Sequence, residues 1–587
     1  MKYPIQEAEE EITNILSDLL KKHKISIKIK LEIPPDKKMG DFSFPCFSLS
    51  KNLKKPPNKI AEELTIQIQK SNIWIDRVVN SGPYINFYLN KEKLINDSIK
   101  NIIEKKEKYG YLKDKKQKVI VEHTSANPNG PLHVGRARNP IIGDTIFRIY
   151  RAAGYNVESQ FYLDDLGKQV GILAWGTNNI SSEDLEKYKD EELRDYDFKR
   201  NKSDHENVVY YQIASNRLKE DEQVQNKLAE IVKLLEEGDE KTIHMIHKAY
   251  NPVLEGIKDS MKCINIKIDS YIPESKFVKD KSVDDVVEKL KKSENCGNDG
   301  GAYFIDMGPY GIQGRNTKFF FTRSDGTTLY ATRDIAYHLW KAENADILIN
   351  ILGEDHKLES KQVEIALNLV GSKIIPIPIF YSFVSLPGGK MSTRRGRVVY
   401  LDDLIQECVN RAYEEVKKRR GKELTEEKMK EISEIVGTGA IRYNIIKVQP
   451  EKDIVFKWEE ALNFEGNSCP FIQYAHARAC SILRKNNEKI TKFESKEIKN
   501  NSEIKLIKKL SQFPNIIKEA SEGFKPHIIP NYLFEVASEF NQFYRDCPVL
   551  SEEKEILRHS RLKIVESTKI VLKNGLDLIG VNAPEEM

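Results

Sequence analysis

The sequence predicts an α/β plus all-α protein of several domains, in which a parallel sheet is followed by a helical bundle. Its 587 residues exceed what one hydrophobic core usually holds, so two to four domains are expected. Between residues 116 and 400, apolar strand-like runs alternate with helical patterns, which is typical of a parallel sheet covered on both faces. From about residue 425 onward the pattern is helical. We therefore expect a small α+β N-terminal unit, a central α/β domain and a C-terminal helical bundle.

The N-terminal region patterns as a small basic unit. Residues 5–22 have amphipathic helical spacing, a second helix is expected over 57–70, and 78–89 should form a hairpin turning at Ser81-Gly82-Pro83. Residues 1–118 hold 24 Lys and Arg against 16 Asp and Glu, a local charge of +8 in a chain of net charge +4. This charge suggests a polyanionic partner, although a Lys-rich solvated surface explains it at least as well.

The stretch from Lys118 to Gly154 carries the most informative local pattern. Residues 119–121 have strand composition, 127–131 have turn chemistry, and a helical pattern runs on to Gly154, with Pro131 suited to the first helical turn. A strand that delivers the chain to a helix N-terminus leaves backbone N–H groups and the positive end of the helix dipole at one spot. The stretch therefore favours phosphate binding.

Two polar side chains of this stretch, His133 and Arg136, lie one helical turn apart. Gly135 between them has no side chain, so a flat ring such as adenine could lie against the backbone. A chance His-Val-Gly-Arg at a polar helix start is the alternative. No G-x-G-x-x-G opens the helix, so a nicotinamide or flavin site has little support.

The later part of the central domain should supply further strands and a helical insertion. Strands are expected over 156–163 and 347–352, the latter followed by Gly353-Glu354-Asp355-His356 at the sheet edge where ligands bind. Residues 177–260 are expected to form a helical insertion. The apolar run 374–386 should be a strand leading into 387–396, where glycines bracket a cationic segment. That segment indicates either a mobile, phosphate-seeking loop or a solvated turn.

Two motifs, in this order, resemble the signatures of class I aminoacyl-tRNA synthetases. His133-Val134-Gly135-Arg136 resembles HIGH, and Lys390-Met391-Ser392-Thr393-Arg394 resembles KMSKS. The text from Glu122-His123-Thr124-Ser125-Ala126-Asn127 through Tyr330-Ala331-Thr332-Arg333-Asp334 looks like the arginyl-tRNA synthetase family. The resemblance covers nearly the whole chain and implies a class I Rossmann-like catalytic domain.

The resemblance implies ATP-dependent ligation of L-arginine to tRNA(Arg) through an arginyl-adenylate, with Mg²⁺ accompanying ATP. The implied catalytic residues are His133, Arg136, Lys390, Arg394 and Arg395. The implied ATP contacts are Pro131, His133, Gly135, Arg136, Lys390, Met391 and Ser392. The implied arginine contacts are Glu122, Ser125, Asn127, His133, Tyr330, Asp334 and, as a weaker second candidate for the guanidinium, Asp355. The implied tRNA contacts are Tyr84, Asn86, Tyr474, Tyr544 and Met587.

Two departures from the family pattern keep alternatives open. Arg136 replaces the second histidine of HIGH and Thr393 replaces the second lysine of KMSKS, so either Arg136, Arg394 or Arg395 supplies the missing cation or the site is slower. The alternatives are a class I synthetase for another amino acid and a catalytically impaired tRNA-binding paralogue. By composition alone, Asp334 would form a surface ion pair with Arg333, and the C-terminal aromatic residues would fill a bundle core.

The expected domains are 1–115 for binding the tRNA elbow, 116–400 for catalysis, 401–445 as connecting helices and 446–587 for binding the anticodon. The seven cysteines are scattered and never form C-x-x-C, so neither a disulfide framework nor a structural metal is expected. No apolar signal region or membrane-length apolar segment stands out. We expect a monomeric, cytoplasmic protein.

Overall fold

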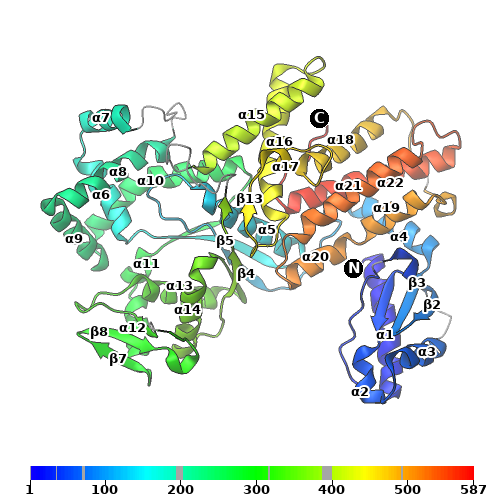
Figure 1. Cartoon of the computed structure of the whole chain (residues 1–587), viewed down its shortest axis with the longest axis horizontal. Coiled ribbons are helices and arrows are strands. Elements are labelled where there is room, and N and C mark those ends of the chain that lie inside the picture. The colour runs from blue at the N-terminus through cyan, green and yellow to red at the C-terminus, as the bar shows by residue number, and fades with distance from the viewer. Residues whose placement is uncertain are drawn as a thin grey trace.

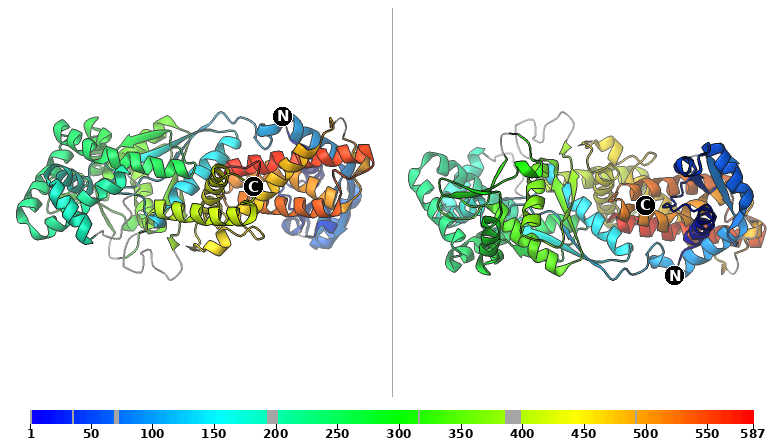
Figure 2. Two further views of the ribbon diagram at one scale, coloured as in Figure 1. Left: turned by 90° about the horizontal axis from the view of Figure 1, so that it is seen from above. Right: turned by 90° about the horizontal axis from the view of Figure 1, so that it is seen from below.

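The computed structural model describes residues 2–34, 36–68, 73–192, 202–314, 317–385, 399–490 and 493–587. The molecule is elongated, with a helical insertion at one end and the N-terminal unit beside the C-terminal helices at the other (Figures 1 and 2). Within the described part of the chain, no helix is both long and apolar enough to cross a membrane.

The N-terminal unit is a three-stranded antiparallel sheet packed with helices. Its main elements are α1 (Pro4–Lys22), β1 (Phe42–Pro45), α3 (Pro57–Gln67), β2 (Ile75–Ser81), β3 (Tyr84–Leu89) and α4 (Lys91–Lys105). The central strand is β3, and the turn pairs Ser81 with Tyr84, which confirms the expected hairpin. The unit is joined to the C-terminal helices: Lys508 pairs with Asp41 at 2.5 Å, and Tyr109 donates to the Leu510 carbonyl at 3.1 Å.

The central sheet has five parallel strands in the order β11-β10-β4-β5-β6. They are β4 (Lys118–Glu122), β5 (Asn156–Leu163), β6 (Ser270–Pro273), β10 (Ile347–Gly353) and β11 (Ile377–Tyr381). The chain proceeds outward from β4 to β6 and then returns to the other side of β4, so the strand order reverses between β4 and β10. Ligands of such sheets bind at the carboxyl ends of the strands at this switch point. The strands predicted over 119–121, 156–163 and 347–352 are confirmed.

Helices and a second small sheet surround the central sheet (Figure 1). The described insertion helices are α6 (Lys168–Asn179), α7 (Ser182–Glu192), α8 (Ser203–Glu220), α9 (Glu222–Glu236) and α10 (Glu240–Cys263), so the helical region begins at Lys168 rather than at 177. An antiparallel sheet that we did not predict follows: β7 (Cys296–Asp299), β8 (Ala302–Asp306) and β9 (Lys318–Phe320). The other helices of this region are α11 (Ser275–Lys279), α12 (Ser282–Lys291), α13 (Tyr330–Asn344) and α14 (Lys357–Leu369).

Two local predictions are wrong. Helix α5 (Arg138–Ala152) begins at Arg138, so Pro131 lies in a loop ahead of it. The backbones of Leu132 and Val134 are instead bonded to Leu401 and Val399, and Val134 begins a short 3₁₀ turn. The described part of the predicted strand, residues 374–385, forms two strands, β11 and β12 (Val384–Ser385), rather than one. The break falls at Ser382, whose N–H and hydroxyl donate to the carbonyls of Pro450 and Glu451, and β12 then pairs with β13 (Ile454–Val455).

The C-terminal region is helical apart from β13, as its periodicity predicted. Its helices are α15 (Leu401–Arg420), α16 (Glu426–Ile446), α17 (Trp458–Ala461), α18 (Cys469–Lys485), α19 (Asn501–Ser511), α20 (Phe513–Glu522), α21 (Ile528–Asp546) and α22 (Glu555–Leu578). The apolar faces of these helices belong to the same buried core as β4, β5 and α5, so the bundle is packed directly on the central domain.

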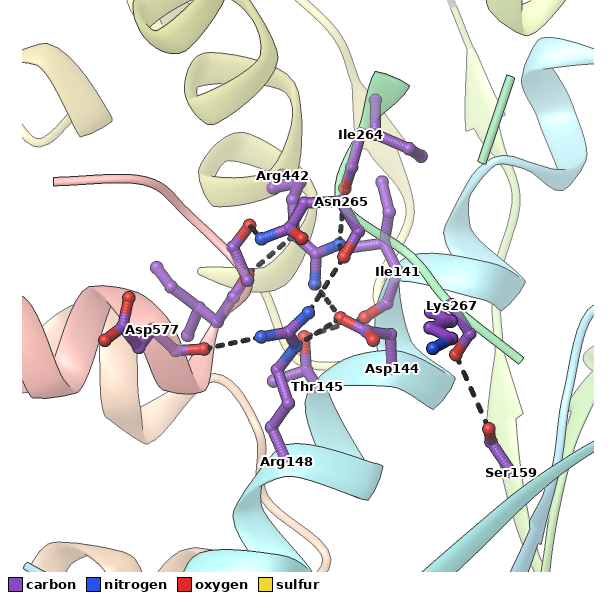
Figure 3. Close-up of polar contacts among 12 residues, drawn as sticks. Ile141, Asp144, Thr145, Arg148, Ser159, Ile264, Asn265, Lys267, Arg442 and Asp577 are labelled. Atoms are coloured by element: carbon purple, nitrogen blue, oxygen red, sulfur yellow. Dashed lines mark hydrogen bonds and ion pairs between the residues drawn. The ribbon is translucent and has the colours of Figure 1, made fainter. Parts of the chain in front are cut away.

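A buried polar hub fastens α5 to the C-terminal helices (Figure 3). Arg442 of α16 pairs with Asp144 of α5 and donates to the carbonyls of Ile579 and Ile264, each at 2.7 Å. Arg148, one turn after Asp144, approaches the same carboxylate at 2.7 Å. The side chains of Arg442 and Asp144 are 1% and 2% exposed, so the hub is shielded from water.

Two glycines permit this close packing around α5. At Gly580, where φ is +68°, a Cβ would lie 2.2 Å from the Arg442 guanidinium. At Gly143 of α5, a Cβ would lie 2.2 Å from the ring of His123, which follows β4. A larger residue at Gly580 would displace the Arg442 guanidinium, and a larger residue at Gly143 would force α5 and His123 apart.

Candidate active site

The loop between β4 and α5 is fastened to the switch point of the sheet. Thr124 and Ser125 have φ values of +73° and +34°, which places both in a region that few non-glycine residues adopt. Asn139 of α5 holds this loop: its Oδ1 accepts from the Thr124 N–H at 2.6 Å, and its Nδ2 donates to the Ile351 carbonyl of β10 at 3.0 Å. The loop is thereby anchored at the edge where ligands of parallel sheets bind.

His133 and Arg136 lie on one tight turn rather than in an α-helix. Residues Val134–Arg136 form a 3₁₀ turn, and His133 caps it by accepting from the Gly135 N–H at its Nδ1, at 2.9 Å. Because Nδ1 is an acceptor, a neutral His133 carries its proton on Nε2 and can act there as a donor. Pro131 and Gly135 are buried beside it, whereas Arg136 is exposed.

The chain returns to this turn just after the predicted cationic loop. The Val134 N–H donates to the Val399 carbonyl at 2.9 Å, and the Leu401 N–H donates to the Leu132 carbonyl at 2.8 Å. On the other side of the loop, Ser385 is held in β12 beside β13. The predicted residues Lys390, Met391, Ser392, Arg394 and Arg395 lie outside the described residues, between these two anchors.

Arg138, which the sequence reasoning did not single out, braces the same region from the start of α5. It is fully buried, and its guanidinium donates to the carbonyls of Ser382 at 2.7 Å, Lys452 at 2.5 Å and Gln449 at 2.6 Å. Burial lowers the pKa of Arg138 to about 10, so the group stays charged at neutral pH. Its donors are directed to backbone, which makes it a brace between α5 and the turn ahead of β12.

Two predicted arginine contacts, Glu122 and Asp334, flank the carboxyl ends of β4 and β10. Glu122 ends β4; it pairs with the buried ammonium of Lys341 at 2.6 Å and accepts from the Ser125 hydroxyl at 3.3 Å. Asp334 lies on α13, and its carboxylate is 3.2 Å from Nδ1 of His338. Burial raises the pKa of Asp334, but the hydrogen bond from His338 and the nearby Lys341 charge outweigh that effect and hold the pKa below its usual value. Asp334 is therefore ionised at neutral pH.

The remaining predicted arginine contacts differ in their surroundings. Tyr330 begins α13 and is 60% exposed; burial and the nearby Glu359 carboxylate raise its pKa. Asn127 donates to Gln169 at 2.9 Å. Asp355 lies in an exposed turn after β10, with His356 as its neighbour at 3.8 Å. Asp355 is thus the more solvated of the two carboxylates considered for the guanidinium.

The predicted alternative for Asp334, an ion pair with Arg333, is wrong. Arg333 points the other way and pairs with Glu274 at 2.9 Å, both side chains being only 4% exposed. Burial raises the pKa of Glu274 to about 8, with the Arg333 charge opposing that rise. Arg333 and Asp334 are therefore adjacent in sequence but contact different partners, Glu274 and His338.

In the C-terminal domain, two predicted tRNA contacts form one exposed aromatic cluster. Tyr474 of α18 and Tyr544 of α21 are 41% and 45% exposed, so they are not the core residues that their helical spacing allowed. The Arg478 guanidinium lies between them, 4.7 Å from one ring centroid and 5.1 Å from the other, and donates to Asn541 at 2.8 Å. Two flat rings and a cation at the surface are suited to unpaired nucleotides.

The other predicted tRNA contacts are less available. Tyr84 is half-buried and meets the exposed ring of Phe47 edge-on, with centroids 5.6 Å apart. Asn86 is 4% exposed, and its Oδ1 accepts from the Ser43 hydroxyl at 2.7 Å. The backbone oxygen of the C-terminal residue Met587 is bonded to Arg420.

A group of potential metal ligands lies beside Tyr400, the residue that pairs with His133. Asp204, His205 and Asp402 converge where α8 meets α15. The Lys202 ammonium is 2.8 Å from the Asp402 carboxylate, and His205 Nε2 is 2.7 Å from it. The Lys202 ammonium therefore already pairs with these carboxylates, and the group forms an ion-pair network.

Comparison with known proteins connects this geometry to a family. The family described as "tRNA synthetases class I (R), catalytic domain" matches residues 98–458, the "Arginyl tRNA synthetase N terminal domain" matches 6–89, and the "DALR anticodon binding domain" matches 472–587.

Individual relatives match over nearly the full length. The arginine–tRNA ligase of Methanocella arvoryzae is 46% identical over 92% of each chain, and that of Methanocaldococcus jannaschii is 42% identical over 98% of this chain and 99% of its own. The solved structure of Thermus thermophilus arginyl-tRNA synthetase superposes with a TM-score of 0.82 and 29% identity, covering 98% of this chain and 99% of that one. The chain belongs to the class I arginyl-tRNA synthetase family.

Proposed function

We propose that this protein ligates L-arginine to tRNA(Arg) at the expense of ATP, through an arginyl-adenylate. The observation that carries the proposal is the ionised Asp334 at the switch point of the parallel sheet, on the same edge as the His133 turn. A carboxylate there selects a cationic amino acid, because charge-assisted hydrogen bonds to a guanidinium are strong and geometrically specific.

Both chemical steps depend on positioning and on neutralising charge. In the first, the arginine carboxylate attacks the α-phosphate of ATP and pyrophosphate leaves; in the second, a ribose hydroxyl of the tRNA terminus attacks the adenylate carbonyl and AMP leaves. Neither step needs a protein nucleophile. Mg²⁺ enters with ATP, as part of the substrate.

Named residues have distinct roles in this proposal. His133 donates from Nε2 to the phosphates, with Pro131, Gly135 and Arg136 lining the nucleotide, while Lys390, Met391, Ser392, Arg394 and Arg395 close over the pyrophosphate. Asp334 and Tyr330 face the guanidinium, with Asp355 as a second candidate. Glu122, Ser125 and Asn127 hold the α-amino and carboxylate groups.

Transfer RNA would extend along the elongated molecule. We propose elbow contacts through Tyr84 and Asn86 in residues 1–115, and anticodon contacts through Tyr474, Tyr544 and Met587 in residues 446–587. Catalysis would occupy 116–400, linked by helices 401–445. Because the Asn86 oxygen already accepts from Ser43, Asn86 would use its amide N–H groups. We propose a monomer acting in the cytoplasm.

The direct test is aminoacylation of bulk tRNA with each standard amino acid in turn. We expect charging with arginine alone. Charging with a different amino acid would instead support a class I synthetase of other specificity. Unimpaired tRNA binding without any charging would support the impaired paralogue.

A further inference from the structure

A continuous polar chain joins the two carboxylates of the proposed arginine site. Asp334 contacts His338, and Nε2 of His338 is 2.7 Å from Nδ2 of Asn350. The Oδ1 atom of Asn350 accepts from Lys341 at 3.2 Å, and Lys341 also donates to Glu122 at 2.6 Å. The fold dictates this path: Asn350 and Glu122 are register partners on neighbouring strands, and the other three share one face of α13. His338, Lys341 and Asn350 are 2%, 0% and 5% exposed.

The donors and acceptors along this chain fix one another. An ammonium can only donate, so Lys341 requires the oxygen of the Asn350 amide and turns its NH₂ group toward His338. Nε2 of His338 must therefore accept. Its Nδ1 lies 2.7 Å from the Asp334 backbone oxygen and 3.2 Å from its carboxylate, two acceptors, so Nδ1 carries the proton. His338 is thereby held as the neutral Nδ1–H form.

This arrangement sets the charge that a substrate meets. Lys341 neutralises Glu122, and a neutral His338 leaves the Asp334 charge uncancelled. The four ionisable side chains then sum to one negative charge, located at Asp334, the member of the network closest to solvent. Within the described part of the chain, no lysine or arginine forms an ion pair with Asp334.

We propose that Lys341, Asn350 and His338 are specificity-determining positioning residues, which keep His338 neutral so that Asp334 presents a full negative charge to the guanidinium. The inference rests on the proposed arginine ligation. It predicts that affinity for arginine depends on the Asn350 amide, which reaches Asp334 only through His338.

Asn350→Asp tests this claim with an isosteric change. The new carboxylate, once ionised, can only accept, so Nε2 of His338 must donate and the ring becomes an imidazolium that pairs with Asp334. The network still sums to one negative charge, but that charge moves from Asp334 to the buried position 350. We expect the KM for arginine to rise roughly ten- to hundredfold, as when a charged hydrogen bond is lost, with the KM for ATP within about twofold. Asn344→Asp is the matched control and should behave as wild type, because Asn344 lies at the exposed end of α13 and donates to the Trp340 carbonyl.

A double variant separates the histidine from general damage at position 350. Glutamine cannot ionise, so adding Asn350→Asp to His338→Gln should change the arginine KM by less than about twofold, a non-additive result. Additive effects would overturn the proposal, as would an unchanged arginine KM in Asn350→Asp alone.

Nitrogen-15 spectra of histidine-labelled protein supply a readout independent of activity. The chain has 11 histidines, and the signal lost in His338→Gln identifies the relevant one. The proposal requires a neutral Nδ1–H ring in wild type and a doubly protonated ring in Asn350→Asp; any other pair of states overturns it. Failure of the proposed function looks different: the wild-type enzyme would not charge arginine at all, whatever the state of His338.

Discussion

Replacing Arg442 by methionine should unfasten α5 from the C-terminal helices. The change removes a 1% exposed guanidinium that pairs with Asp144 and satisfies the carbonyls of Ile579 and Ile264. Each carbonyl left without a donor costs about 1–3 kcal/mol, and breaking a buried ion pair costs about 3–5 kcal/mol. Since Arg148 still reaches Asp144, we take the lower end and expect a loss of about 5 kcal/mol. If the 587 residues unfold as one cooperative unit, that corresponds to a fall in Tm of roughly 4 °C.

Thermal unfolding followed by circular dichroism measures this loss. The matched control is Arg148→Met, which removes the second arginine on the same carboxylate but from a side chain that is 25% exposed, and it should cost only about 1–2 kcal/mol. If Arg442→Met unfolds within about 2 °C of wild type, or no earlier than Arg148→Met, then the hub does not hold the domains together as argued.

Three further outcomes follow from the same structure. Arg478→Ala should raise the Kd for tRNA about tenfold in a filter-binding assay, because it removes the cation between two exposed rings, and an unaltered Kd would remove this cluster from the tRNA site. Glu274→Gln should flatten the pH dependence of stability. The pKa of Glu274 is about 8 in the fold against an ordinary value of 4.5, so Glu274 contributes stability at low pH that is lost as the pH rises toward 8. A variant whose Tm still falls like that of wild type between pH 5 and 8 would contradict this. ATP–pyrophosphate exchange with arginine should require tRNA, because the hub ties α5 to α16, and α16 packs against α18, the helix that carries Tyr474. Full exchange without tRNA would refute that coupling.

The elements that could be predicted were those with a strong local pattern. The apolar runs of β4, β5 and β10, the hairpin at Ser81-Gly82-Pro83 and the helical periodicity after residue 425 each encode their structure within a few residues. The start of α5 could not be placed this way. Residues 132–134 pair with 399–401, more than two hundred residues away, and that contact overrides the helix-initiating preference of Pro131.

The residues of the candidate site show the same distinction between a local sequence pattern and a tertiary contact. Glu122, His133 and Asp334 stand in recognisable motifs, so they could be nominated from the sequence. Lys341 and Asn350 carry no motif, and their roles arise only when α13 is laid across β4 and β10. Arg138 and the Arg442–Asp144 pair were missed for the same reason, because their partners are far away in the chain. Buried charges joined by tertiary contacts leave no periodic signal.

Discrimination between arginine and citrulline, its uncharged isostere, tests the central claim most directly. The measurement is kcat/KM for aminoacylation with each amino acid, in wild type and in Asp334→Asn. We expect a strong preference for arginine in wild type and a loss of about a hundredfold or more of that preference in the variant, since breaking a buried charge pair costs about 3–5 kcal/mol. The KM for ATP should not change. An unaltered ratio in Asp334→Asn would show that Asp334 does not read the guanidinium.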